Sequence, residues 1–182
     1  MITVTETKLK DVYLIKPKQF GDNRGWFMES YSKRDFEAAG LNIDFVQDNR
    51  SFTALKGTVR GLHFQRPPMA QTKLLSCLRG RIMDVAVDLR HDSPTYLQWI
   101  GVELSEDDPT QILIPKGFAH GFVTLSDDVE IMYKVDAFYS PECDGGVRWN
   151  DPDIGVDWGV TDPVLSEKDQ HSPFLRDLPA IF

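Results

Sequence analysis

The chain has little cysteine: Cys77 and Cys143 are its only two thiols, and they form no Cys-x-x-Cys pair. This number is too small for a disulfide framework, so we expect reduced cysteines and a cytoplasmic protein. No apolar run approaches the roughly 18 residues that cross a bilayer, and no basic flank followed by an apolar stretch opens the chain. We therefore expect neither a membrane span nor a signal peptide.

The chain also lacks any long run of basic residues. Its 20 Lys and Arg are outnumbered by 28 Asp and Glu, which gives a net charge of −8. An acidic surface repels nucleic-acid backbones and anionic membranes, so we expect neither as a partner. Single Arg and Lys residues instead stand within apolar or glycine-rich stretches, a pattern that favours a small anionic ligand.

Length and composition are those of an ordinary folded protein. The 182 residues are 41% hydrophobic and 26% charged, which excludes a disordered or collagen-like chain. No linker-like change in composition divides the sequence and no internal repeat is visible. We expect a single domain over residues 1–182.

Helix signals are scarce. Residues 32–39 begin with a capping serine and stop before Gly40, which predicts one short helix, and residues 165–170 predict a second short turn capped by Ser166. Most other segments read as short strands between closely spaced turns. Many short strands of this kind predict an all-β sandwich or barrel.

Two segments give the clearest strand patterns. Residues 111–114 form an apolar run that Pro115 ends. Residues 81–90 alternate, which places Met83, Val85, Val87 and Leu89 on one face and Asp84, Asp88 and Arg90 on the other.

The four histidines fall into two pairs. His91 and His171 lie in polar turn stretches and are expected to be solvated. His63 and His120 each lie in an apolar run flanked by glycine. A hydrogen-bonded core histidine and a functional one remain equally open for each of these two.

The run around His120 resembles the cupin signature, Pro-x-Gly-x-x-His, over residues 115–120. The resemblance implies a cupin-like double-stranded β-helix, or jelly-roll barrel, with a few short helices. Metal-binding cupins add an earlier His-x-His and a Glu, but here Gln65 stands where the second His would be. Three N/O ligands are the usual minimum for a catalytic metal, so we expect no metal.

A histidine without a metal can act as a general base near neutral pH. A base that removes a proton from carbon needs a cation or donor at the developing enolate oxygen, and Lys73 and Arg60 are candidates. Lys73 could equally snorkel its charge to solvent. Many carboxylates could orient the base, and spacing alone selects none.

Residues 133–139 suggest a second acid–base group. If this segment is one strand, Tyr133, Val135, Ala137 and Tyr139 share a face. The two tyrosines could be core aromatics, which often fill β-sheet cores. They could instead supply a phenol proton donor and a stacking ring.

Several separated motifs together resemble the dTDP-4-dehydrorhamnose 3,5-epimerase family, and they follow the family's order over nearly the whole chain. They are Phe-Gly-Asp-Asn-Arg-Gly-Trp-Phe (20–27), Phe-Val-Gln-Asp-Asn (45–49), Arg-Gly-Leu-His-Phe-Gln (60–65), Ile-Pro-Lys-Gly-Phe-Ala-His-Gly-Phe (114–122), Tyr-Ser-Pro (139–141) and Leu-Ser-Glu-Lys-Asp (165–169).

The resemblance implies a role for each matching residue. It assigns the base to His63, the carboxylate partner of that base to Asp169, the proton donor to Tyr133 and the lysine near the C4 carbonyl oxygen to Lys73. Tyr139 matches the ring that stacks on thymine, and Asp144 stands where the family often has Glu. The substrate-binding positions are Arg24, Phe27, Glu29, Gln47, Asn49, Arg60, His120, Tyr139, Asp144 and Lys168.

The resemblance further implies a homodimer whose subunits share parts of their active sites, and a dTDP-4-keto-6-deoxyhexose as substrate. It implies no metal and no other cofactor, and no Gly-rich dinucleotide fingerprint is present. The implied reaction is inversion at C3 and C5 of dTDP-4-dehydro-6-deoxy-D-glucose.

Three other functions remain open. A 3- or 5-epimerase of another dTDP-4-keto-deoxysugar would keep His63, Asp169 and Tyr133. A non-catalytic nucleotide or sugar binder would have lost the base or its partner, and a metal-dependent cupin dioxygenase would need bound metal.

The spacing of Arg60 and His63 presents one difficulty. They are an odd number of residues apart, which puts them on opposite faces of a regular strand; a bulge at Gly61 would realign them.

Overall fold

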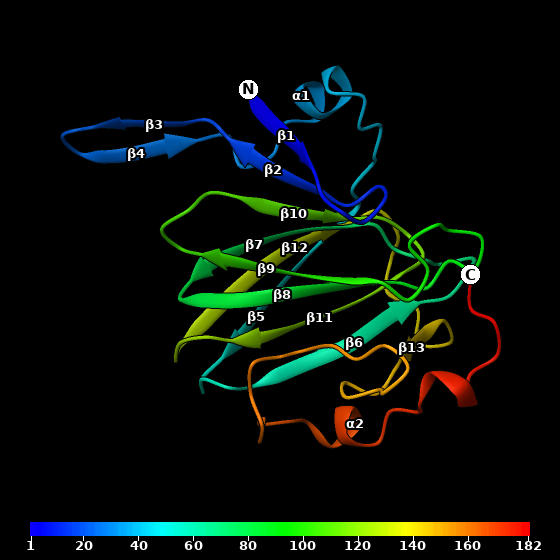
Figure 1. Cartoon of the computed structure of the whole chain (residues 1–182). Coiled ribbons are helices and arrows are strands. Elements are labelled where there is room, and N and C mark those ends of the chain that lie inside the picture. Colours follow the sequence, from blue (N-terminus) through cyan, green and yellow to red (C-terminus); the bar gives the residue numbers. More distant parts are fainter.

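Two antiparallel sheets face each other in the computed structural model, which describes all residues from 1 to 182 (Figure 1). The elements are β1 (Ile2–Glu6), β2 (Tyr13–Pro17), β3 (Gln19–Asp22), β4 (Gly25–Met28), α1 (Lys33–Ala38), β5 (Gln47–Thr53), β6 (Val59–Gln65), β7 (Lys73–Arg79), β8 (Arg81–Asp88), β9 (Trp99–Ser105), β10 (Gln111–Ile114), β11 (Phe118–Thr124), β12 (Val129–Val135), β13 (Asp144–Gly146), α2 (Glu167–Gln170) and a 3-10 turn (Leu175–Asp177). One sheet has the order β1-β2-β10-β7-β12-β5 and the other β13-β6-β11-β8-β9. The expected all-β, cupin-like class with a few short helices is confirmed.

The main core lies between the two sheets. Because side chains alternate along a strand, each strand sends every second residue into this space. Leu75 and Ile131 from the six-stranded sheet meet Ile82, Ala86 and Phe122 from the five-stranded sheet, and all are buried. Side chains from both sheets therefore fill the space between them.

The strand predicted over residues 81–90 is β8, which ends at Asp88, and it is buried on both faces. Val85 and Val87 point outward but are covered by the loop-rich C-terminal segment, which brings Trp158 against them. Asp84 lies on the opposite, inward face and is completely buried. The polar face of this strand thus looks into the barrel.

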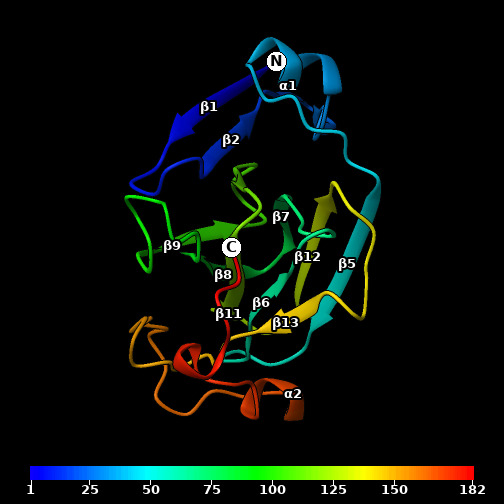
Figure 2. The same cartoon turned by 90° about the vertical axis from the view of Figure 1, so that its right-hand side faces the viewer.

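Both predicted helical segments are present. Ser32 caps α1, and its hydroxyl accepts the backbone N–H of Asp35. Ser166 caps α2 and accepts the N–H of Asp169 in the same way. Figure 2 shows α2 below β6 and β13, at one edge of the five-stranded sheet. None of the helices has the length and apolar character needed to span a bilayer.

The segment 133–139 is not one strand, because β12 ends at Val135. Val135 pairs with Gln47, the first residue of β5, and with Lys73, the first residue of β7. Beyond Val135 neither neighbouring strand continues, so no partner remains for a longer β12. Tyr139 therefore follows in a loop and does not share a strand face with Tyr133.

A two-stranded ribbon, β3 and β4, projects away from the barrel on one side (Figure 1). Its aromatic side chains are unusually exposed: Phe20 by 52%, Trp26 by 61% and Phe27 by 67%. Arg24 lies at the turn between the two strands and pairs with Asp22.

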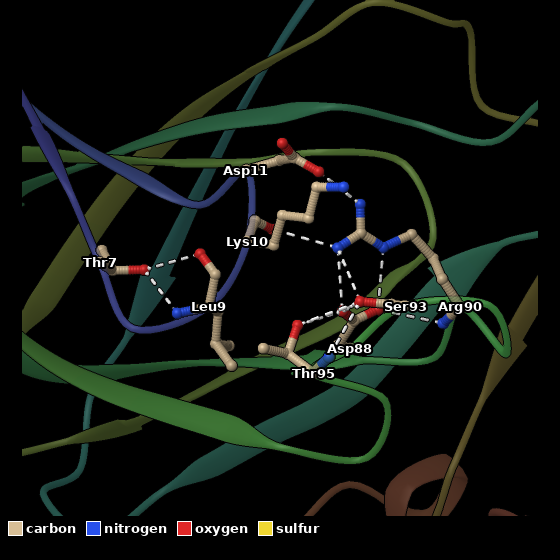
Figure 3. A network of polar contacts seen from close by, with 8 residues as sticks. All are labelled: Thr7, Leu9, Lys10, Asp11, Asp88, Arg90, Ser93 and Thr95. Atoms are coloured by element: carbon tan, nitrogen blue, oxygen red, sulfur yellow. Dashed lines mark hydrogen bonds and ion pairs between the residues drawn. The ribbon is translucent and has the colours of Figure 1, made fainter.

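A polar network joins the end of β8 to the turn that precedes β2 (Figure 3). Arg90 donates to both carboxylate oxygens of the buried Asp88 and to Asp11, and Ser93 and Thr95 also bond Asp88. Burial would raise the pKa of Asp88, but the hydrogen bonds from Arg90, Ser93 and Thr95 bring it below its usual value. The network thus holds an ionised carboxylate and ties the N-terminal turn to the barrel.

The pairing of β6 with β11 contains the expected irregularity. His120 pairs with His63 and Phe122 pairs with Arg60, so two steps on β11 span three steps on β6. The extra residue is accommodated at Gly61, whose φ of +132 favours glycine. A Cβ at this position would lie 2.6 Å from Cα of Gly121.

We expect Gly61→Ala to destabilise the protein by more than about 2 kcal/mol, because the added methyl group meets backbone atoms and the φ angle is unfavourable. The control is Gly155→Ala, where φ is also positive, at +66, but no atom lies within 4 Å of the added Cβ. That control should cost about 1 kcal/mol. Urea unfolding measures both, and equal losses would contradict the close-approach argument.

Candidate active site

A cavity of about 360 Å³ opens between the two sheets, and the core residues Phe122 and Ile131 form part of its wall. Both sheets, α2 and the loop after β12 contribute to its walls. Nine of the predicted residues line it: Arg60, His63, Lys73, His120, Tyr133, Tyr139, Asp144, Lys168 and Asp169.

His63 and Asp169 form a close pair in this cavity. Nε2 of His63 lies 2.6 Å from Oδ1 of Asp169, and the two side chains are 34% and 4% exposed. Burial would raise the pKa of Asp169, but the hydrogen bond and charge interaction with His63 bring it below its ordinary value. An ionised, immobile carboxylate therefore orients the imidazole, while the ring stays accessible from the cavity.

Arg60 lines the same cavity as His63 because of the bulge at Gly61. Its guanidinium spans to the other sheet, where Nε donates to Oγ1 of Thr53 at 2.9 Å and a terminal nitrogen donates to the carbonyl of Phe52. The odd spacing of Arg60 and His63 is thus compatible with one shared wall.

Lys73 and Tyr133 lie on the six-stranded sheet, across the cavity from the sheet that carries His63. The Lys73 ammonium is 6.0 Å from the centre of the Tyr133 ring. Desolvation lowers the pKa of Lys73 to about 8, although the carboxylates of Asp84 and Asp144 oppose this shift. Burial raises the pKa of Tyr133, so its phenol keeps its proton at neutral pH.

A second histidine–carboxylate pair lies deeper in the barrel. Nε2 of His120 is 2.8 Å from Oδ2 of Asp84, and the side chain of Asp84 is fully buried. The other oxygen of Asp84 has no hydrogen-bond partner. Sequence reasoning did not select Asp84 as a site residue, although the alternation of residues 81–90 placed it on the polar face of its strand.

Tyr139, Asp144 and Lys168 lie around the mouth of the cavity. The Tyr139 side chain is 57% exposed. Lys168 bonds Oδ2 of Asp144 at 2.5 Å, and this hydrogen bond raises the pKa of the lysine. Asp144 therefore pairs with another predicted site residue.

Five predicted binding residues do not line the cavity of this chain. Arg24 and Phe27 belong to the projecting ribbon, and Glu29 follows it. Gln47 and Asn49 lie on β5 and bond each other at 2.8 Å. Gln47 also accepts the backbone N–H of Tyr139, which links this pair to a residue of the cavity wall.

The cavity also contains residues that the sequence analysis did not assign to it: Ser51, Phe64, Gln65, Gln71, Phe122, Ile131 and Ser166. Alternation along β11 places Phe122 on the same face as His120, so that residue could have been found from spacing. Gln71 and Ser51 carry no such signal.

No group of three or more His, Cys, Asp or Glu side chains is arranged to hold a metal ion. The two other histidines, His91 and His171, are exposed as predicted.

Comparison with known families gives one match over most of the chain. Residues 6–177 match the family described as dTDP-4-dehydrorhamnose 3,5-epimerase. A dTDP-4-dehydrorhamnose 3,5-epimerase of Sinorhizobium fredii is 50% identical over 175 residues, which cover 96% of this chain and 90% of the relative.

Solved structures of relatives superimpose on this chain over nearly its whole length. The dTDP-4-dehydrorhamnose 3,5-epimerase of Bacillus anthracis, crystallised with TDP and pyrophosphate, superimposes with a TM-score of 0.94 at 52% identity and covers 96% of this chain and 100% of its own. The Legionella pneumophila enzyme in complex with dTDP-4-keto-L-rhamnose gives a TM-score of 0.92 at 42% identity, with 99% and 96% covered.

The environment of Lys73 predicts that its amine titrates near pH 8. NMR of ¹³Cε-labelled lysines can follow the titration, and the spectrum of Lys73→Arg assigns the signal. Because the folded pKa lies below the ordinary 10.5, the unfolded state binds more protons than the folded state between these two pH values. The free energy of unfolding therefore rises with pH through this window, as the cost of burying the charged amine is relieved. A Lys73 signal that titrates with the surface lysines would contradict the desolvation argument.

Proposed function

The chain belongs to the dTDP-4-dehydrorhamnose 3,5-epimerase family, and we propose that it performs this epimerisation by proton transfer between His63 and Tyr133 on opposite sides of a 4-keto sugar. Its activity is that of an isomerase acting on a dTDP-linked sugar. The observation that carries the proposed mechanism is the position of the two groups. His63 comes from β6 of one sheet and Tyr133 from β12 of the other, and both line one cavity.

The first step is removal of a proton from carbon. The C4 ketone makes the hydrogens at C3 and C5 acidic. His63 can remove one of them as a proton if its ring is held with one nitrogen toward the sugar. Asp169 supplies that orientation through its 2.6 Å contact with Nε2, so Nδ1 is the nitrogen left free to accept the proton. The electron pair of the broken C–H bond moves into the enolate, whose negative charge develops on the C4 oxygen.

Lys73 stabilises this enolate oxygen. Its ammonium stands on the wall opposite His63 and is largely desolvated, which strengthens its interaction with a developing anion. The lowered pKa has a consequence, because the charge of Lys73 is lost above about pH 8. The rate should fall there even though the fold gains stability from the same group.

Tyr133 completes the inversion. Its phenol donates a proton to the carbanion carbon from the ring face opposite His63, which inverts the configuration of that carbon. The protonated His63 and the Tyr133 phenolate then return to their starting states by exchange with water, so that a solvent proton enters the product. Rotation of the sugar or a ring flip presents the second carbon to the same pair.

The cations around the cavity suit the diphosphate of the substrate. Arg60 and Lys168 line its walls, and Tyr139 offers an exposed ring on which a thymine base can stack. Asp144 holds Lys168 in place by a hydrogen bond. His120, fixed by Asp84, completes the polar wall near the sugar.

The same family likeness supports a homodimer in which each subunit completes the site of the other. Arg24, Phe27 and Glu29 do not reach the cavity of their own chain, and the ribbon that carries them projects outward with exposed aromatic rings. A second copy of the chain would bury these exposed rings. We place these three residues at the nucleotide of the partner subunit.

Exchange of sugar protons tests the proposed reaction. Proton NMR of dTDP-4-keto-6-deoxyglucose with the EDTA-treated protein in D₂O should show loss of both the C3 and the C5 signals. His63→Ala should abolish both exchanges and leave dTDP binding largely intact. Loss of the C3 or the C5 signal alone would favour the alternative, a single-site epimerase, and persistent exchange in His63→Ala would remove His63 from the role of base.

Tyr133→Phe separates proton removal from proton return. This variant keeps the ring but lacks the phenol proton, so C–H exchange should continue while inversion at C5 fails. Chiral analysis of the reduced sugar measures the outcome. Normal formation of the L-sugar would show that another group donates the proton.

Mixed dimers test the shared site. Arg24→Ala and His63→Ala should each be nearly inactive alone. Refolding them together should restore about a quarter of wild-type activity, because half of randomly formed dimers are mixed and each has one complete site. No recovery in a mixture that contains mixed dimers would contradict sharing.

A further inference from the structure

The loop that carries Tyr139 has unusual hydrogen bonding. Ala137, Phe138 and Tyr139 lie beyond the end of β12, and none of their backbone groups bonds to another backbone group. The rings of Phe138 and Tyr139 are 60% and 57% exposed, so hydrophobic packing does not hold this segment either. Backbone polar groups in folded proteins need partners, and here the partners come from side chains.

Three glutamine side chains supply these partners. Nε2 of Gln71 donates to the carbonyl of Ala137 at 2.9 Å, and Oε1 of Gln47 accepts the N–H of Tyr139 at 3.3 Å. Gln65 binds on both sides of Tyr139: Nε2 donates to the carbonyl of Phe138 at 3.1 Å, and Oε1 accepts the N–H of Ser140 at 2.8 Å. Four successive residues are thus held by glutamine amides.

Gln65 is the central member of this group. It is only 5% exposed, and its second N–H donates to the carbonyl of Met69 at 2.6 Å, so both of its donors are used. A side-chain amide carries the same donor and acceptor as a peptide group, so Gln65 serves the loop as a neighbouring strand would. It also links the loop after β12 to the loop between β6 and β7.

We propose that Gln65 and Gln71 are positioning residues that, together with Gln47, hold the 137–140 backbone and thereby fix the ring of Tyr139 at the mouth of the cavity. The three side chains form a glutamine cradle. Its effect is on the nucleotide end of the substrate, because none of its hydrogen bonds involves His63, Lys73 or Tyr133. The inference rests on the proposed function, which makes Tyr139 the stacking ring for the base.

Gln65→Met tests the cradle, since methionine has a similar length and shape but none of the three hydrogen bonds. We expect the Kd for dTDP, measured by calorimetry, to rise about tenfold, or ~1.4 kcal/mol. KM should rise with it, while kcat should change by less than about twofold because the reacting groups are untouched. Gln71→Met loses one hydrogen bond and should raise the Kd by about threefold.

A double-mutant cycle with Tyr139→Ala distinguishes positioning from direct contact. If Gln65 acts through Tyr139, adding Gln65→Met to Tyr139→Ala should weaken dTDP binding no further. Independent, multiplying effects would overturn the proposal and make Gln65 a direct ligand of the substrate. Should Gln65→Met fail to fold, the same cycle with Gln71→Met decides the question.

Thr95→Val is the control for a general loss of stability. Thr95 bonds the buried Asp88 in the network of Figure 3, none of whose residues lines the cavity. This variant should lower the melting temperature and leave the Kd for dTDP unchanged. Wild-type protein that does not bind dTDP would overturn the proposed function and this inference with it, whereas normal binding by Gln65→Met beside weakened binding by Tyr139→Ala would overturn the cradle alone.

Discussion

The close approach of β6 and β11 is the constraint on which the site depends. Gly61 and Gly121 face each other where the two backbones meet, and a Cβ on Gly121 would lie 2.7 Å from the carbonyl oxygen of Arg60. The bulge that this contact permits turns Arg60 and His63 toward one wall, where His63 pairs with His120 across the strands. Any larger residue at either glycine would separate the strands and with them three of the polar groups that line the cavity.

Charge is distributed so that the cavity differs from the rest of the molecule. The chain has a net charge of −8, yet Arg60, Lys73 and Lys168 converge on one opening. The carboxylates nearby are each engaged with a histidine or lysine: Asp169 with His63, Asp84 with His120, and Asp144 with Lys168. An anionic ligand therefore meets cations of which two, Arg60 and Lys168, are already oriented by hydrogen bonds.

Buried and partly buried polar side chains connect segments that the sheets do not connect. Gln65 joins two loops, Asp88 anchors a turn from the N-terminus, and Asp136 accepts the N–H of Thr72 at 2.7 Å just before Lys73. These groups bond loop backbone or a cation, and Asp88 also accepts from the hydroxyls of Ser93 and Thr95. Such contacts are specific in direction, so they position loops more accurately than apolar packing does.

Much of this protein follows from local sequence. Short strands, two serine-capped helices and the alternation of residues 81–90 could be predicted because hydrophobic period, capping and turn residues act over a few positions. The motifs around His63 and His120 likewise indicated residues of a site, and the family likeness named Asp169 as the partner of His63 but did not name Asp84 as the partner of His120. The end of β12 could not be predicted, since it depends on where β5 and β7 begin.

The contacts that build the site were decided by tertiary structure. His63 and Asp169 are separated by 106 residues, and no spacing rule selects one carboxylate among the 28 acidic residues of the chain. From its sequence Asp84 is an ordinary polar strand residue. It lies inside the barrel because the C-terminal segment covers the opposite face of β8. The hydrogen-bond partners of Gln65 and Gln71 include backbone groups of the loop after β12, which is distant in sequence from both. Local sequence sets the conformation of each segment, but the pairing of distant polar groups depends on how the two sheets close over one another.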